Sequence, residues 1–180
     1  MEERLYFAYG SNINLDQMAY RCPDAQVVGP VMLEDYELLF RGNGGGNGVA
    51  TIAPKEGSYV YGLLWKLTPA CEQSLDRYEG YPHLYYKRGV AVWDTEGQRR
   101  TVMAYVMTNL PFREPTMPSS NYYYGIKAGF RQNGLPMKAL DQALQNARRE
   151  VEERAAQRPP WHYSNYQPNA QRRKKTGHER

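Results

Sequence analysis

The sequence lacks the features that mark several large classes of protein. It has only two cysteines, Cys22 and Cys71, which lie far apart among the 180 residues. Two such cysteines make neither a disulfide framework nor a local metal-binding pair, so we expect both to be reduced and buried. No stretch approaches the run of roughly 18 apolar residues that a membrane-spanning helix requires, and the acidic start Met1-Glu2-Glu3 is unlike a signal peptide. These absences predict a cytoplasmic protein that is not embedded in a membrane.

The motifs of several common catalytic machineries are also missing. There is no Gly-x-Ser-x-Gly elbow around a serine nucleophile, and the glycine-rich run 41–48 lacks the Gly-Lys-Ser/Thr ending of a nucleotide-binding loop. We therefore interpret that run as a hairpin loop or a lid. The three histidines are His83, His162 and His178, and no spacing of His, Cys and acidic residues suggests a metal site.

Positive charge is concentrated at the C-terminal end of the chain. Of 23 Lys and Arg and 19 Asp and Glu, six basic residues and one acidic residue lie from Arg158 onward, giving that segment +5 and residues 1–157 a net −1. Residues 1–157 are thus predicted to be one nearly neutral domain, for which nucleic acid is not an expected partner. Residues 158–180, with Pro159-Pro160 and the run Arg172–Lys175, are predicted to be a poorly ordered basic tail.

Hydrophobic periodicity predicts strands through most of the chain and one long helix near its end. The expected strands are Leu5–Tyr9, Tyr59–Leu67, Arg88–Trp93 and Thr101–Met107, with a further candidate pair around Val27-Val28 and Glu37–Phe40. Met137, Leu140, Leu144, Ala147 and Val151 recur at helical spacing and predict an amphipathic helix that packs on the sheet. Strands bracketed by helices indicate an α+β domain with a small curved or closed sheet.

The first strand leads directly into a polar turn, Tyr9-Gly10-Ser11-Asn12. Gly10 can adopt backbone angles closed to other residues and lets a ligand approach the main chain. Asn14 then reads as the N-cap of a helix, with Gln17 reaching back to it. Such a turn presents several N–H donors to one point and suits a carboxylate or an oxyanion. An ordinary strand-to-helix turn is the alternative.

A second segment places a carboxylate at the end of a short helix. Thr68 can cap this helix, Pro69 occupies its first position, and Gly80 is placed to end it immediately after Glu79. A surface carboxylate at a helix end is the more common outcome for such a glutamate. The residues of the segment alone do not decide between a structural and a catalytic role.

Together, Tyr9–Asn12 and Leu75–Gly80 resemble the γ-glutamylcyclotransferase family, which has a Tyr-Gly-Ser-Asn turn followed by a Leu-Asp-x-x-Glu-Gly element. Four further segments are similar to family segments: Gly48–Ile52, Val60–Trp65, Tyr105–Asn109 and Asn133–Pro136. The resemblance extends from about Leu5 to about Glu153 and is greatest to the enzymes that act on γ-glutamyl amino acids. The glutathione-directed branch usually has a leucine where this chain has Asn12.

The resemblance implies a small mixed β-barrel with flanking helices. It also implies an enzyme that acts on small molecules and needs no cofactor. Its reaction would be the intramolecular cyclisation of a γ-glutamyl amino acid to 5-oxoproline, with release of an amino acid or amine, without a metal. Glu79 would be the catalytic residue. The substrate-binding residues would be Tyr6, Phe7, Ala8, Tyr9, Gly10, Ser11, Asn12, Tyr105 and Tyr122. A homodimer is a further expectation.

The implied role of Glu79 raises a difficulty of proton affinity. A free glutamate, with a pKa of about 4.3, would have to accept a proton from an ammonium group with a pKa near 8, which costs roughly 5 kcal/mol. Burial among Tyr78, Tyr81 and other aromatic side chains would have to raise the pKa of Glu79. We expect the phenols of Tyr105 and Tyr122 to bind the substrate α-carboxylate or to orient Glu79, although both could be ordinary half-buried sheet tyrosines.

Other functions fit the residues less well. One is a cyclotransferase for γ-glutamylamines or for a γ-glutamylated natural product. Another is a non-catalytic module that binds a small ligand, with the basic tail recruiting an acidic partner. The run Tyr122-Tyr123-Tyr124 could stack on nucleic-acid bases, but aromatic residues near a sheet are usually part of the core.

Overall fold

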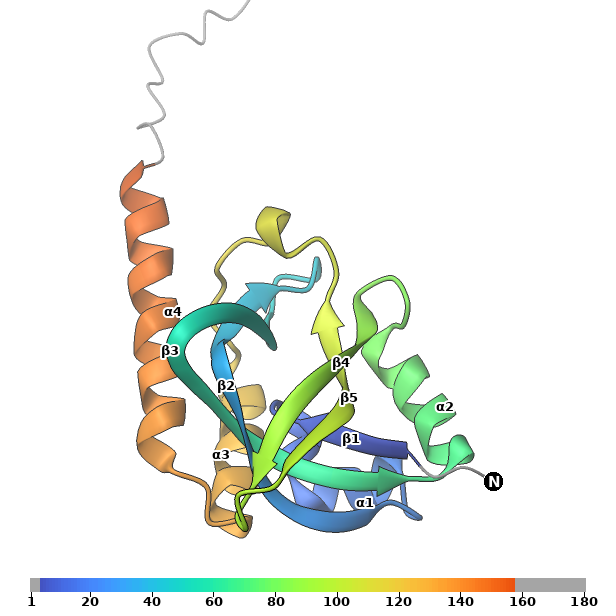
Figure 1. Ribbon diagram of the computed structural model, residues 1–180. Coiled ribbons are helices and arrows are strands. Elements are labelled where there is room, and N and C mark those ends of the chain that lie inside the picture. Colours follow the sequence, from blue (N-terminus) through green and yellow to red (C-terminus); the bar gives the residue numbers. More distant parts are fainter. Residues whose placement is uncertain (1–3, 158–180) are drawn as a thin grey trace, which may run out of the picture.

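A closed barrel of five strands forms the centre of the molecule, with helices on its outside (Figure 1). The computed structural model describes residues 4–157, so the tail predicted for residues 158–180 lies outside the described residues. In chain order the elements are β1 (Arg4–Ala8), the 3₁₀ turn η1 (Ser11–Ile13), α1 (Leu15–Arg21), β2 (Gln26–Gly42), β3 (Gly48–Leu67), α2 (Pro69–Glu79), β4 (Tyr85–Asp94), β5 (Arg99–Met107), the 3₁₀ turn η2 (Leu110–Phe112), α3 (Ser120–Gln132) and α4 (Met137–Gln157).

The barrel is mixed, with one parallel pair of strands among antiparallel ones. The strands follow the order β1-β3-β2-β4-β5 around the barrel. It closes where β1 runs parallel to β5, with Tyr6 opposite Met103, and the other neighbouring strands are antiparallel. This arrangement confirms the fold class expected from the sequence.

The segment around residues 25–40 is one long strand, so the predicted pair of strands was wrong. β2 runs without interruption from Gln26 to Gly42 and pairs along its length with β3. Its register with β3 shifts between Glu34 and Tyr36, where Asp35 has a φ of 58°. Such a bulge bends a strand while leaving it in the sheet. The polar residues Glu34 and Asp35, which lie between the two predicted strands, are therefore the site of a bend.

The glycine-rich segment, predicted to be a hairpin loop or a lid, is the hairpin loop that joins the antiparallel strands β2 and β3. Asn43 organises this loop, since its backbone N–H donates to the Asn47 carbonyl oxygen at 3.1 Å and its side-chain oxygen accepts from the Gly45 N–H at 2.8 Å. Gly44 and Gly46 have φ values of 87° and 85°, which favour glycine. The loop therefore reverses the chain through local hydrogen bonds and glycine conformations.

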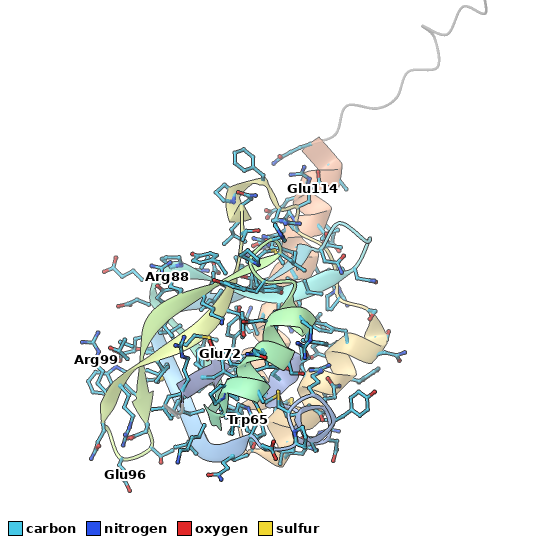
Figure 2. All side chains as sticks on the ribbon, turned by 90° about the vertical axis from the view of Figure 1, so that its right-hand side faces the viewer. Trp65, Glu72, Arg88, Glu96, Arg99 and Glu114 are labelled. Carbon is cyan, nitrogen blue, oxygen red and sulfur yellow. The ribbon has the colours of Figure 1, made fainter. Side chains whose placement is uncertain are left out.

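Helix α2 begins and ends at the residues predicted for it. The side-chain oxygen of Thr68 accepts a hydrogen bond from the Cys71 N–H, and Pro69 is the first helical residue. Gly80 ends the helix in the left-handed conformation, with a φ of 64°. Figure 2 looks onto this helix in front of the barrel, with Glu72 in its first turn. These local signals make Glu79 the last residue of α2.

Helix α4 packs along the outside of the long strands. In Figure 1 it stands beside β2 and β3, on the side opposite α2. Leu140 and Ala147 are buried in the core, and Leu144 packs against it, as the helical spacing predicts.

Over residues 4–157, none of the helices is both long and apolar enough to cross a membrane. Cys22 and Cys71 are both free and buried.

Gly62 of β3 allows β1 to approach β3 closely. A Cβ atom at Gly62 would lie 2.2 Å from the Ala8 carbonyl oxygen and 2.5 Å from a ring carbon of Phe7. We therefore predict that Gly62→Ala lowers the free energy of unfolding by about 2–3 kcal/mol, because overpacking forces the backbone to move. Gly89 of β4 is the matched control, since a Cβ there would make an ordinary 3.7 Å contact with Thr101.

Urea unfolding of the two variants beside the wild type measures both effects. Gly89→Ala should remain within about 0.5 kcal/mol of the wild type. Equal stability of Gly62→Ala and Gly89→Ala would contradict the close approach of β1 and β3.

Candidate active site

A cavity of about 240 Å³ is lined by residues of the barrel strands, the turn after β1, the end of α2 and the start of α3. Its size suits a small molecule, although it is smaller than typical drug-binding pockets. Most residues predicted for the site line it: Tyr6, Tyr9, Gly10, Ser11, Asn12, Glu79, Tyr105 and Tyr122. Phe7 and Ala8 do not, because both are fully buried in the core. The structure thus gathers around one cavity residues that lie between Tyr6 on β1 and Tyr122 on α3.

The turn after β1 is pressed closely against the barrel wall. A Cβ atom at Gly10 would lie 3.1 Å from the Ala50 Cβ atom, so a larger residue would push the turn away from the cavity. Ser11 begins a 3₁₀ turn, and the first N–H groups of such a turn have no acceptor within it. The indole N–H of Trp65, labelled in Figure 2, donates to the Asn12 carbonyl oxygen at 3.0 Å. The turn is therefore fixed from the β3 side.

The start of α1 agrees only partly with the expected capping pattern. Asn14 caps the helix, because its side-chain oxygen accepts from the Gln17 N–H at 3.0 Å. The expected return contact from the Gln17 side chain was wrong. The Asn14 N–H already donates to the Ser11 carbonyl oxygen, and the Gln17 side chain accepts from Arg21 instead.

Glu79 is tied to the turn through the side chain of Asn12. Asn12 Nδ2 donates to Glu79 Oε1 at 2.8 Å and to the Tyr6 phenol oxygen at 2.9 Å. Asn12 is almost completely buried, whereas Glu79 is partly accessible. The end of α2 is thereby joined to the turn after β1, and Glu79 is oriented by Asn12.

Arg21 completes this arrangement and was not identified from the sequence. It is the last residue of α1, and its Nη1 donates to Asn12 Oδ1 at 2.7 Å and to Ser11 Oγ at 3.1 Å. Its guanidinium carbon lies 3.8 Å from the centre of the Tyr78 ring. In the sequence, Arg21 is one cation at the end of a seven-residue helix, and no motif singles it out.

Burial raises the pKa of Glu79 to about 7. Arg21 and the hydrogen bond from Asn12 act in the opposite direction and limit this rise. Tyr78 and Tyr81, expected to cover the carboxylate, are 47% and 41% exposed. Tyr78 still lines the cavity beside Glu79, whereas Tyr81 does not. Tyr6, Tyr105 and Tyr122, which come from elements distant in sequence, line it as well.

The tyrosines around the cavity differ in where their hydroxyl hydrogens point. Tyr105 donates to Asp76 Oδ1 at 2.5 Å, and Tyr85 donates to the Ala50 carbonyl oxygen at 2.6 Å. Tyr122 instead accepts from the Ala50 N–H at 3.0 Å, and Tyr6 accepts from Asn12. Burial raises the pKa of each of these phenols, so all four remain protonated near neutral pH.

This pattern changes the expected role of Tyr105. Its only hydroxyl hydrogen is directed to Asp76, so it neither orients Glu79 nor donates to a substrate carboxylate, and towards the cavity it is an acceptor. Tyr6 and Tyr122 differ, because among residues 4–157 their own hydroxyl hydrogens have no acceptor. They are the phenols that can donate to a bound anion.

Several cavity residues were given no role by the sequence analysis. These residues are Asn43, Val49, Ala50, Leu84 and Tyr85. Asn43 comes from the β2–β3 hairpin loop, and Leu84 directly precedes β4. Neither residue carries a chemical signal in sequence, because its position depends on how the barrel closes.

The raised pKa of Glu79 predicts that Glu79→Gln stabilises the protein in alkaline solution. Between the ordinary pKa of 4.5 and about 7 the folded state holds more protons than the unfolded state, so the free energy of unfolding falls as the pH rises. The Gln variant does not titrate and should be about 3 kcal/mol more stable than the wild type at pH 8.

Chemical denaturation at pH 8 and at pH 4 measures this difference. It should nearly disappear at pH 4, where Glu79 is protonated in the folded state and mostly protonated in the unfolded state. If the Gln variant is no more stable than the wild type at pH 8, the ionised carboxylate does not destabilise the folded protein, and the pKa of Glu79 is not raised by burial.

Known proteins are similar to this chain in both sequence and fold. A model of the family described as "Gamma-glutamyl cyclotransferase, AIG2-like" matches residues 6–124. The γ-glutamylcyclotransferases of Bos taurus and Homo sapiens are each 37% identical to this chain over 145 residues, covering 76% of this chain and 75% of theirs. A solved structure titled "Gamma-glutamyl cyclotransferase" superposes with a TM-score of 0.72 at 34% identity, covering 79% of this chain and 86% of that one. The chain therefore belongs to the AIG2-like γ-glutamyl cyclotransferase family.

Proposed function

We propose that this protein is a γ-glutamylcyclotransferase that converts γ-glutamyl amino acids into 5-oxoproline and a free amino acid. The observation that carries the proposal is the environment of Glu79. Its carboxylate lines a small cavity, accepts a hydrogen bond from Asn12 at 2.8 Å, and has a pKa raised to about 7. A carboxylate with a pKa near the working pH suits a group that accepts and returns a proton.

The polarity of the cavity wall suits the α-amino acid end of a γ-glutamyl group. Glu79 and the phenol oxygen of Tyr105 are acceptors, which favour an ammonium group. The hydroxyl hydrogens of Tyr6 and Tyr122, together with the N–H groups of the turn at Ser11, favour a carboxylate or a carbonyl oxygen. We infer that the substrate ammonium faces Glu79 and that the α-carboxylate faces Tyr122.

The pKa of Glu79 removes most of the cost of the first proton transfer. An α-ammonium group has a pKa near 8, so transfer to a glutamate at pKa 4.3 costs roughly 5 kcal/mol. Transfer to Glu79, with its pKa of about 7, costs only about 1 kcal/mol by the same relation. The base is therefore strong enough, while a large fraction of it remains ionised at neutral pH.

Ring closure then takes place within one molecule. The free α-amine attacks the γ-carbonyl carbon, which forms the new C–N bond and moves the carbonyl electrons onto the oxygen. N–H groups of the turn at Ser11 and Asn12 stabilise that oxyanion. The oxyanion collapses, Glu79 returns its proton to the leaving nitrogen, and the original amide C–N bond breaks. The Glu79 carboxylate then accepts the second proton from the positively charged ring nitrogen, which becomes the lactam N–H, and passes it to the released amine, which leaves as an ammonium group. Because nucleophile and carbonyl belong to one substrate, holding it in the cyclising shape supplies much of the rate enhancement.

The proposed reaction is balanced without a redox step, since it closes a ring, breaks one amide bond and relocates protons. We therefore expect no organic cofactor and no metal requirement. The partner at this site is a small molecule. The cytoplasmic setting and the homodimer expected from the sequence remain predictions, as does the acceptor preferred among γ-glutamyl compounds.

Release of 5-oxoproline from a panel of γ-glutamyl amino acids, γ-glutamylamines and glutathione tests the proposal. We expect γ-glutamyl amino acids to be the preferred substrates. Glu79→Gln should lower kcat by about 10²–10⁴-fold, because the amide keeps the shape but cannot carry a proton. Glu72→Gln is the matched control, since Glu72 lies on the same helix and pairs with Lys87 at 2.6 Å outside the cavity.

The control variant should retain activity within about threefold of the wild type, and both variants should fold. A Glu79→Gln enzyme that keeps more than about a tenth of the wild-type rate would exclude Glu79 as the base. No release of 5-oxoproline from any compound of the panel would contradict the proposed activity itself.

A further inference from the structure

Arg21 stands behind the cavity wall and does not line the cavity. Its guanidinium group reaches three acceptors, of which Asn12 Oδ1 is the nearest at 2.7 Å. Ser11 Oγ lies 3.1 Å from the same nitrogen, Nη1, and Gln17 Oε1 lies 2.8 Å from Nη2. Arg21 therefore contacts the turn that holds Glu79 without occupying the space for a substrate.

The shape of the site suits arginine rather than lysine. The guanidinium carbon lies 3.8 Å from the centre of the Tyr78 ring, and the Tyr78 hydroxyl lies 3.2 Å from Ser11 Oγ. A flat guanidinium can stack on a ring and at the same time direct several N–H groups at fixed acceptors. A lysine ammonium would keep the charge but would lose the stacking and the fixed fork.

The contact with Arg21 decides which way the Asn12 amide faces. Arg21 has only donors, so the amide oxygen of Asn12 has to face it. The amide nitrogen then faces Glu79 and Tyr6, and both of its hydrogens are used. If the amide turned by 180°, its oxygen would face the Glu79 carboxylate, and two acceptors would repel each other.

We propose that Arg21 is a positioning residue that acts on Glu79 through Asn12, by fixing the donor side of the amide towards the carboxylate and by placing a positive charge behind it. This inference rests on the proposed role of Glu79 as the proton carrier. Arg21 then stabilises the ionised form of the base, and burial alone would make that form too rare at neutral pH.

The other groups around Glu79 do not supply this charge. The phenols that interact with it come from β1, β4, β5 and α3 and from the turn after β1, and burial keeps them protonated: Tyr6, Tyr9, Tyr85, Tyr105 and Tyr122. Asp76, one turn earlier on α2, is engaged with Lys87 at 2.8 Å and with Tyr105. Within residues 4–157, the charged side chain that lowers the pKa of Glu79 is thus Arg21.

The experiment compares Arg21→Met, Arg21→Lys and Arg77→Met with the wild type. The titration of the Glu79 carboxyl is followed by ¹³C NMR in the free protein, and the pH dependence of kcat/KM for 5-oxoproline release is measured in parallel. Arg77 is the matched control, because it is an exposed arginine two residues before Glu79. Its loss removes the same formal charge without touching Asn12.

We expect Arg21→Met to raise the midpoint of the Glu79 titration by about one pH unit or more. The acid limb of kcat/KM should move upwards by the same amount, so the loss of activity is largest at low pH and partly recovered at high pH. Arg21→Lys should produce a smaller shift of the same sign, and Arg77→Met should leave both midpoints unchanged.

An unchanged Glu79 midpoint in the Arg21 variants, with activity reduced equally at every pH, would overturn the proposal and leave Arg21 as a structural brace. If Arg21→Met does not fold, Arg21→Lys decides by the same two readouts. A shifted midpoint in a protein that releases no 5-oxoproline would support the effect of Arg21 on Glu79 and contradict the proposed function instead. The two failures are therefore distinguishable.

Discussion

The burial of one carboxylate at the end of α2 is the constraint on which the site depends. A glutamate in water is too weak a base for an ammonium group, and a glutamate buried without partners would seldom be ionised. Glu79 lies between these limits, because burial raises its pKa to about 7 while Asn12 and Arg21 oppose a further rise. The chemistry of the site thus follows from a balance between desolvation and two polar contacts.

The barrel brings about this balance by joining segments that are distant in sequence. Asn12 and Glu79 are 67 residues apart, and they meet because β1 pairs with β3 directly before α2 begins. The close approach of the two strands at Gly62 is part of that geometry. Tyr122 of α3 also lines the cavity, and its hydroxyl accepts a hydrogen bond from the Ala50 N–H. The side of the cavity formed by α3 is therefore tied to β3 as well. The fold therefore determines both the access to Glu79 and its partners.

Much of the fold could be predicted, because many of its signals are local. Thr68, Pro69 and Gly80 determine the ends of α2 through hydrogen bonds within a few residues, and the stripe of α4 follows from helical spacing. The bend in β2 at Asp35 could not be found in this way. Its polar residues look like the end of a strand, and only pairing with β3 shows that the strand continues.

The residues of the candidate site likewise divide into those that the sequence identifies and those that depend on tertiary contacts. Glu79 and the turn from Tyr9 to Asn12 were identified through their resemblance to a family pattern, and both line the cavity. Arg21 and the direction of the Tyr105 hydroxyl were not foreseen, because each depends on a partner brought close by the tertiary structure. Tyr78 and Tyr81 were expected to bury Glu79, but both are exposed by more than a third and only Tyr78 lines the cavity. The other tyrosines of the lining come from other elements.

The pH dependence of kcat/KM for 5-oxoproline release by the wild-type enzyme tests the central claim most directly. If Glu79 acts as a base with a pKa of about 7, kcat/KM should fall tenfold for each pH unit below that value. An acid limb near pH 4.3, the ordinary value for glutamate, would show that the carboxylate that carries the proton is not raised by burial, and would contradict this account.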